Sequence, residues 1–170
     1  MASNLKFRLT GGASNTDQHA SFGGVMSSSE VSNTALNNLF KDVTPDQAIN
    51  GVKNPGHFRA IDVLNTGDAE AQAVEIYMST ETPSDDTQLN IGHEAENNPH
   101  ASDWAGQLLD NENTAPSDPS VTMNHPLEGS KLSLPNIPAG MACRIWIERE
   151  VDAGAINTPN DQGTITVKYA

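Results

Sequence analysis

The stretch from residue 57 to residue 92, HFRAIDVLNTGDAEAQAVEIYMSTETPSDDTQLNIG, decides the fold of this chain. Its first run, Arg59 to Leu64, is short, mostly apolar and contains β-branched residues. Its second run, Ala73 to Met78, alternates apolar and polar side chains. The residues between them include NTGD at 65–68, which favours a turn. Alternation on both sides of such a break predicts two paired antiparallel strands.

Similar alternating runs recur along the chain, as at 5–9, 87–91, 141–149 and 164–169. Glycine and proline are frequent between them, and helical periodicity is nearly absent. We therefore expect an all-β fold, an antiparallel β-sandwich of immunoglobulin-like or jelly-roll-like type. The side chains expected on the inner faces are Ile61, Val63, Val74, Ile76, Met78, Ile145, Ile147, Ile165 and Val167.

The chain of 170 residues is long enough for one domain with a real core. We expect residues 1–26 to form a strand followed by a Gly-rich arm. Residues 27–170 are expected to form the sandwich, with an acidic loop insertion at 93–119. The arm itself, residues 11–24, is polar and flanked by two Gly-Gly pairs, so it is predicted to be extended and ordered only by contact.

Two short regions before the central stretch carry helix signals. Residues 27–40 leave two alternatives open, a helix that begins near Ser32 or Asn33, or a strand around Val31. Pro45 to Ala48 predicts a single helical turn.

The charge is strongly negative and unevenly spread. The chain has 9 Lys and Arg against 22 Asp and Glu, a net charge of −13. No Lys or Arg lies between Arg59 and Lys131, whereas 14 acidic residues lie from Asp62 to Glu128. This balance argues against nucleic acid and anionic membranes as partners. The acidic stretch is interpreted as a solvated face, or as a surface complementary to a basic partner or a weakly bound cation.

Patterns typical of catalysis or metal binding are missing from the sequence. The five histidines have no zinc-ligand spacing, and no G-x-S-x-G motif is present. Cys143 is the single cysteine, expected to be a small buried apolar group. DNEN at 110–113 suggests either a calcium contact or a solvated acidic turn. We expect no enzyme, cofactor or metal site, although a carboxylate pair for glycoside hydrolysis stays open because sequence does not give the separation.

Five residues are candidates for partner contact. Trp146 and Arg144 share one face of the 141–149 run, which is either covered by a second layer or exposed to a partner. Phe22 and Val25 are apolar anchors in or beside the arm, and Trp104 is one in the insertion.

Four segments resemble a family of small virion structural proteins of tailed bacteriophages. They read LKFRLTGGASNTDQHASFGGVMSSSEV from residue 5, FRAIDVLNTGDAEAQAVEIYMSTETPSDDTQLNIG from 58, LPNIPAGMACRIWIEREV from 134 and TITVKY from 164. The motifs that carry the likeness are structural: the Gly-Gly arm, the NTG turn at 65–67, the PAG turn at 138–140 and the IWI strand at 145–147.

The resemblance implies a non-enzymatic part of a phage particle, assembled in the host cytoplasm. A capsid decoration protein bound to the major capsid protein, as a homo-oligomer, fits small size and acidity best. A tail, baseplate or fibre-attachment protein is the first alternative. A carbohydrate-binding module is the second, with Trp104 and Trp146 as its aromatic platforms. No run approaches the ~18 apolar residues of a membrane helix, and the first ten residues lack a secretory signal.

Overall fold

The chain folds almost entirely into β-strands, which confirms the expected all-β class. The computed structural model describes residues 2–31 and 39–170. The strands are β1 (Leu5–Thr10), β2 (Gly23–Glu30), β3 (Val52–Asn65), β4 (Glu75–Thr80), β5 (Thr87–His93), β6 (His100–Ala101), β7 (Ala105–Leu108), β8 (Leu132–Ser133), β9 (Met141–Val151) and β10 (Thr164–Lys168). The helices are short: η1 (Gln18–Ala20) and α1 (Pro45–Asn50).

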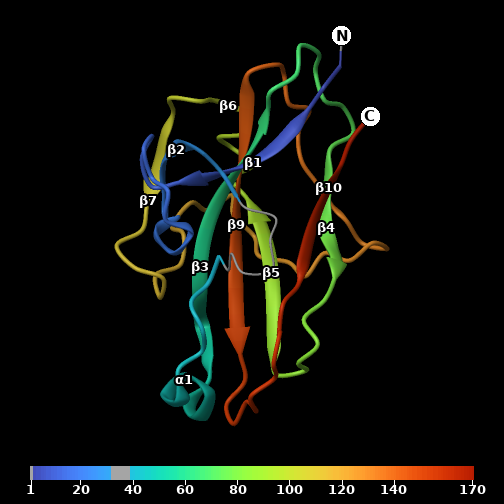
Figure 1. Ribbon diagram of the computed structural model, residues 1–170. Helices are drawn as coiled ribbons and strands as arrows, with labels where there is room; N and C mark the ends of the chain where they lie inside the picture. Colours follow the sequence, from blue (N-terminus) through green and yellow to red (C-terminus); the bar gives the residue numbers. More distant parts are fainter. Residues whose placement is uncertain (1, 32–38) are drawn as a thin grey trace.

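Two antiparallel sheets stack on each other, as expected for a β-sandwich (Figure 1). The larger sheet has the order β5-β9-β3-β1-β2-β7, with β6 added alongside β9. The smaller sheet has the order β10-β4-β8. Strands β3 and β9 are the longest and lie side by side through the centre of the larger sheet (Figure 1).

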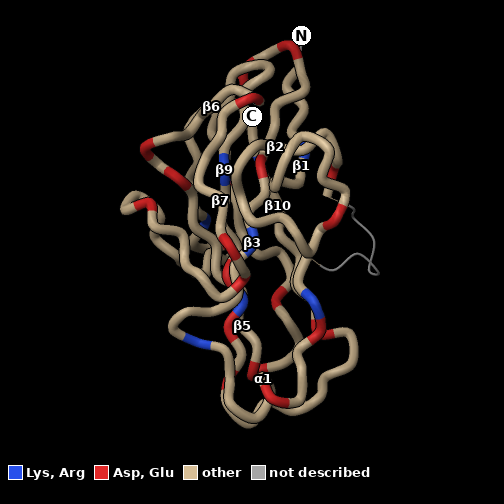
Figure 2. The backbone as a smooth tube through the Cα atoms, turned by 90° about the vertical axis from the view of Figure 1, so that its left-hand side faces the viewer, with Lys and Arg blue, Asp and Glu red and all other residues tan. Residues whose placement is uncertain are grey.

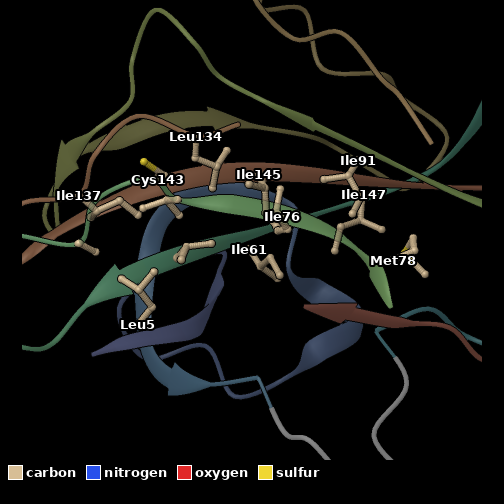
Figure 3. Packing of buried hydrophobic residues seen from close by; sticks show 13 residues of the cluster. Leu5, Ile61, Ile76, Met78, Ile91, Leu134, Ile137, Cys143, Ile145 and Ile147 are labelled. Atoms are coloured by element: carbon tan, nitrogen blue, oxygen red, sulfur yellow. The ribbon is translucent and has the colours of Figure 1, made fainter. Parts of the chain in front are cut away.

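The hydrophobic core fills the space between the two sheets (Figure 3). All nine side chains expected on the inner faces belong to it, seven of them buried and Ile165 and Val167 half-buried against the others. Burying each large aliphatic side chain contributes roughly 1.5–3 kcal/mol. Alternation therefore predicted the core-facing side chains of β3, β4, β9 and β10 correctly.

The expected pairing of the two central runs is wrong. The 59–64 run lies in β3, which pairs with β1 and β9, whereas the 73–78 run leads into β4, which pairs with β10 and β8. The two runs face each other across the core instead. The Asn65 side chain stabilises the connection from β3 to β4, which passes from one sheet to the other. Its amide donates to the Ala69 and Ile137 carbonyls at 2.7 and 2.8 Å. Alternation fixes which face is buried but not which neighbour a strand has.

The stretch 11–24 is not an extended arm. It folds back on its own sheet, where the Thr10 and Ser21 hydroxyls both donate to the Ala60 carbonyl, at 3.0 and 2.6 Å. The predicted boundary at residue 26 falls inside β2, which pairs with both β1 and β7. Gly23 makes this return possible: its φ is +99°, and a Cβ there would lie 2.0 Å from the Gln107 carbonyl oxygen.

The two predicted helix signals have different outcomes. The turn at Pro45 is confirmed as α1, with a capping box between Thr44 and Gln47. The helix expected near Ser32 or Asn33 lies outside the described residues. Val31, the centre of the alternative strand, directly follows β2, and its N–H donates to the Phe7 carbonyl at 2.9 Å.

The core makes a first prediction about stability. Ile76 is fully buried in β4, so Ile76→Ala should lower the free energy of unfolding by about 2–5 kcal/mol through lost burial and a residual cavity. Leu108→Ala is the matched control, because that side chain is 62% exposed and its loss should change stability by at most about 0.5 kcal/mol. Urea denaturation followed by tryptophan fluorescence measures both. Equal losses in the two variants would contradict the assigned core.

Candidate functional site

The second face of the larger sheet is covered by residues 93–123, which we call the covering segment. Its Leu109 packs with Phe58, Ala60 and Trp146 in a separate buried cluster, against which Val121 and Met123 also pack. The polar insertion expected at 93–119 thus adds β6 and β7 to the larger sheet and also covers its second face. Of the two alternatives for the Trp146 face, the covered one is what the structure shows.

A buried ion pair joins β3 and β9 beneath this segment. Asp62 and Arg144 lie directly opposite each other in the strand register, and both are fully buried. Arg144 donates from Nε to Asp62 Oδ1 at 2.6 Å and from Nη2 to Oδ2 at 2.9 Å. The same Nη2 donates to the Gly24 carbonyl at 2.8 Å, which ties β2 to the pair. A bidentate, charge-assisted contact of this kind fixes position strongly.

Two aromatic rings close this ion pair from the covering segment. His100 Nε2 lies 3.3 Å from Asp62 Oδ1, and the His100 ring stacks at 4.3 Å on Trp104. The Trp104 ring in turn lies 5.1 Å from the Arg144 guanidinium carbon. Burial alone would raise the pKa of Asp62, but His100 and Arg144 outweigh burial and hold it below its usual value.

Glu94 of the covering segment makes a further buried polar contact with β9. Its Oε1 accepts the indole N–H of Trp146 at 2.8 Å, and the residue is only 1% exposed. Burial raises the pKa of Glu94, while the Trp146 hydrogen bond opposes that rise. The carboxyl group therefore serves the fold as a hydrogen-bond acceptor whose charge is costly.

A second ionic cluster lies farther along β3 and β9, near Arg59 and Arg149. Arg59 donates from Nη2 to Glu112 Oε2 at 2.6 Å, and Arg149 donates from Nη2 to His57 Nδ1 at 2.7 Å. Because a guanidinium only donates, the His57 ring accepts through Nδ1 and is neutral, in line with the pKa of His57 that burial lowers. Burial also lowers the pKa of Arg149 to about 10. Phe40 lies about equally close to both guanidinium groups, at 5.1 and 5.0 Å.

The DNEN turn at 110–113 is largely solvated, because Asp110, Asn111 and Asn113 are exposed. Glu112 is the exception: it reaches inward to Arg59 and keeps 22% of its side chain exposed. Within residues 2–31 and 39–170, no group of three or more His, Cys, Asp or Glu is arranged to hold a metal ion. Cys143 is buried as expected, and burial raises the pKa of its thiol to about 12.

An open cleft of about 480 Å³ lies on the outside of the covering segment, and we call it the Trp104 cleft. Trp104, Glu94, Asn97, Gln107 and Asp118 are among its lining residues. The Asn97 side-chain nitrogen lies 3.4 Å from Glu94 Oε2 and 2.8 Å from Asp118 Oδ2, so the two carboxyl groups are close neighbours.

The pKa values of Asp118 and Glu94, the two carboxyl groups at the Trp104 cleft, are shifted in opposite directions. The Ser120 hydroxyl, which donates to Asp118, lowers the pKa of Asp118, whereas burial raises that of Glu94. Such a split is typical of acid–base pairs. Glu94 is nevertheless only 1% exposed, and its Oε1 accepts the Trp146 N–H, so the fold already uses this carboxyl group. The cleft therefore offers an aromatic ring and amide and carboxylate groups for binding.

The five predicted contact residues divide into two groups. Arg144 and Trp146 are fully buried by their own chain, which corrects their assignment to a partner surface. Phe22, Val25 and Trp104 are half-buried: Phe22 lies under Arg59 at 4.7 Å, Val25 pairs with β7, and Trp104 lines the cleft. Their role in partner contact stays a prediction.

The sequence analysis missed several residues of these clusters, among them Asp62, Glu94 and His100. Asp62 had a usable signal, because it is a charge inside the apolar run 59–64 and buried charges need partners. Glu94 and His100 stand among polar residues, where no pattern separates them from solvated neighbours.

Comparison with known proteins identifies no relative of this chain. No family model, no curated protein and no solved structure matches this chain. Among the described residues, no helix has both the length and the apolar character to cross a membrane.

Glu94 makes a prediction about pH and stability. Its folded-state pKa is raised, so its contribution is fully present below the unfolded-state value of about 4.3 and is lost as the pH rises through the folded-state pKa. Glu94→Gln keeps an oxygen for the Trp146 N–H but cannot ionise. We expect this variant to be more stable than the wild type at pH 8, with a smaller difference at pH 4, in urea denaturation.

Glu96→Gln is the matched control, because Glu96 lies in the same segment with an exposed side chain. The control should show no such gain at pH 8. A Glu94→Gln variant less stable than the wild type at pH 8 would show that the charge itself is needed.

Proposed function

We propose that this protein is a non-enzymatic structural protein of a tailed-phage virion, a decoration protein that binds the outer surface of the major capsid protein shell as a homo-oligomer. The resemblance of four segments to such proteins supports the proposal. So does the contact of Glu94, the carboxyl group with the raised pKa at the Trp104 cleft, whose Oε1 accepts the Trp146 N–H and so serves the fold.

One observation carries the proposal: the described ionic clusters are used to hold the fold. Arg59, Arg144 and Arg149 are buried, three of the nine basic residues of the chain. Each donates to groups of its own chain, such as Glu112, Asp62 and His57. Side chains locked in this way stabilise a scaffold and are poorly placed to transform a substrate.

The exterior that remains is predominantly acidic, and Figure 2 shows acidic residues along most of the chain with few basic ones between them. Such a surface favours basic patches on a partner and repels phosphate backbones. Repeated copies on a lattice make modest single contacts sufficient, through multivalency. A tail, baseplate or fibre-attachment position uses the same properties and is the alternative location.

Fractionation of the particle tests this proposal. Heads and tails are separated from purified virions, and each fraction is analysed by quantitative mass spectrometry. We expect this protein in the heads, at a copy number that is a simple fraction of that of the major capsid protein. Its presence in tails alone would move it to the alternative location, and its absence from both would refute a virion role.

A second candidate function, saccharide binding, is favoured by the Trp104 cleft. The apolar ring edge and the nearby Asn97, Gln107 and Asp118 side chains provide both the apolar contact and the hydrogen-bond partners that a sugar ring uses. Trp146 is buried, so of the two platforms first considered only Trp104 is accessible.

A glycan array with the purified protein tests this second candidate. Binding of any glycan should be lost in Trp104→Ala, because the aromatic contact is removed, and kept in Leu108→Ala, whose exposed side chain does not line the cleft. Circular dichroism melting checks that both variants remain folded. An array without a hit, or a hit unaffected by Trp104→Ala, would remove the candidate.

A further inference from the structure

Two large apolar side chains are exposed at one end of the sandwich. Ile49, in α1, is 68% exposed, and Ile156, in the connection between β9 and β10, is 75% exposed. They are the two most exposed of the four large hydrophobic residues on the surface of the described chain. We call this end, with Ile49, Ile156 and the exposed Ala153 and Pro159, the apolar tip.

Backbone hydrogen bonds hold the two parts of the apolar tip together. The N–H groups of Gly154 and Ala155 donate to the Ala48 carbonyl at 2.8 and 3.0 Å, and Gly154 also reaches the Ile49 carbonyl at 3.2 Å. The N–H of Ile156 donates to Asp86 Oδ2 at 3.1 Å. Segments about a hundred residues apart in the chain thus place both isoleucines in one region, on a backbone that is already ordered. Such preorganisation lowers the entropic cost of binding.

Acidic side chains surround the apolar tip. Asp46 lies in the first turn of α1, Asp86 holds Ile156, and Asp152 begins the connection and pairs with Lys53. An apolar centre with a charged rim is the usual anatomy of a protein-binding patch. The rim is complementary to lysine and arginine and repels a second acidic copy, an anionic lipid surface or a phosphate backbone.

We propose that the apolar tip is the surface by which this protein docks on its particle, in an apolar pocket rimmed by basic residues on a shell protein. This inference rests on the proposed virion function and specifies which end of the sandwich makes the contact. The isoleucine side chains fill the pocket, while the aspartates orient the approach. The opposite end of the molecule, with β6 and the two chain termini, then faces away from the shell (Figure 1).

Binding to particles that lack this protein tests the inference. Heads purified from a phage deleted for the gene are mixed with purified protein, and bound protein is measured by co-sedimentation at increasing concentration. The double variant Ile49→Ser/Ile156→Ser should bind on the order of 100-fold more weakly, because it lacks the two aliphatic side chains that become buried in the pocket on binding. Leu108→Ser is the matched control, because Leu108 is 62% exposed on β7, away from the tip, and it should bind like the wild type.

Each outcome separates the inference from the function on which it rests. Wild-type protein that binds, with a double variant that binds equally well or a Leu108→Ser variant that is equally weakened, overturns the docking surface and leaves the virion role standing. Wild-type protein that does not bind at all overturns the decoration role and this inference with it. Affinity should fall as salt is raised from 50 to 500 mM, and an affinity independent of salt would overturn the basic pocket. Melting curves confirm that the variants fold, as expected for exposed positions.

Discussion

The ion pair between Asp62 and Arg144 is the contact on which the larger sheet depends. It joins β3 to β9 in direct register, and its bidentate geometry leaves little freedom to shift. Through the Gly24 carbonyl and His100 it also fixes β2 and the covering segment. Loss of one partner would leave a buried charge, at a cost of about 3–5 kcal/mol. The net free energy of such a pair is small. Its importance lies in the penalty for leaving either Asp62 or Arg144 as an unpaired buried charge.

This ion pair explains why the polar second face of the larger sheet needs the covering segment. The core side of β3 and β9 packs on the small sheet through Ile61, Val63, Cys143, Ile145 and Ile147, whereas the other side carries Asp62, Arg144 and Glu148. Those groups are tolerated because the covering segment excludes water and supplies His100 for Asp62 and Trp104 for Arg144. Asn90 of β5 donates to Glu148. A long polar stretch thereby becomes part of the folded body, and its charged residues are used for cohesion.

The two surfaces proposed for function lie at different places and are compatible. The apolar tip is formed by α1 and the β9–β10 connection. The Trp104 cleft is lined in part by residues of β7, a strand that lies away from α1 (Figure 1). A protein docked through its tip would keep the cleft in solvent. The acidic exterior between them suits attachment to a basic shell and discourages self-aggregation in the free state.

The sequence by itself determined the class of fold and the buried face of each main strand. Successive side chains of a strand point to opposite faces, so the local alternation of apolar and polar residues is enough to predict that Ile61, Ile76 and Ile145 point inward. The burial of Cys143 and the helical turn at Pro45 could be predicted for the same reason, because their sequence signals are local.

Only the tertiary structure decided which strands are neighbours, where the 11–24 stretch goes and what Trp146 and Glu112 touch. Those outcomes depend on partners far along the chain, such as Asp62 with Arg144 or Glu94 with Trp146. An alternating run specifies a buried face equally well whether its partner lies beside it or across the core. The choice is made by side-chain contacts that exist only once the chain has folded.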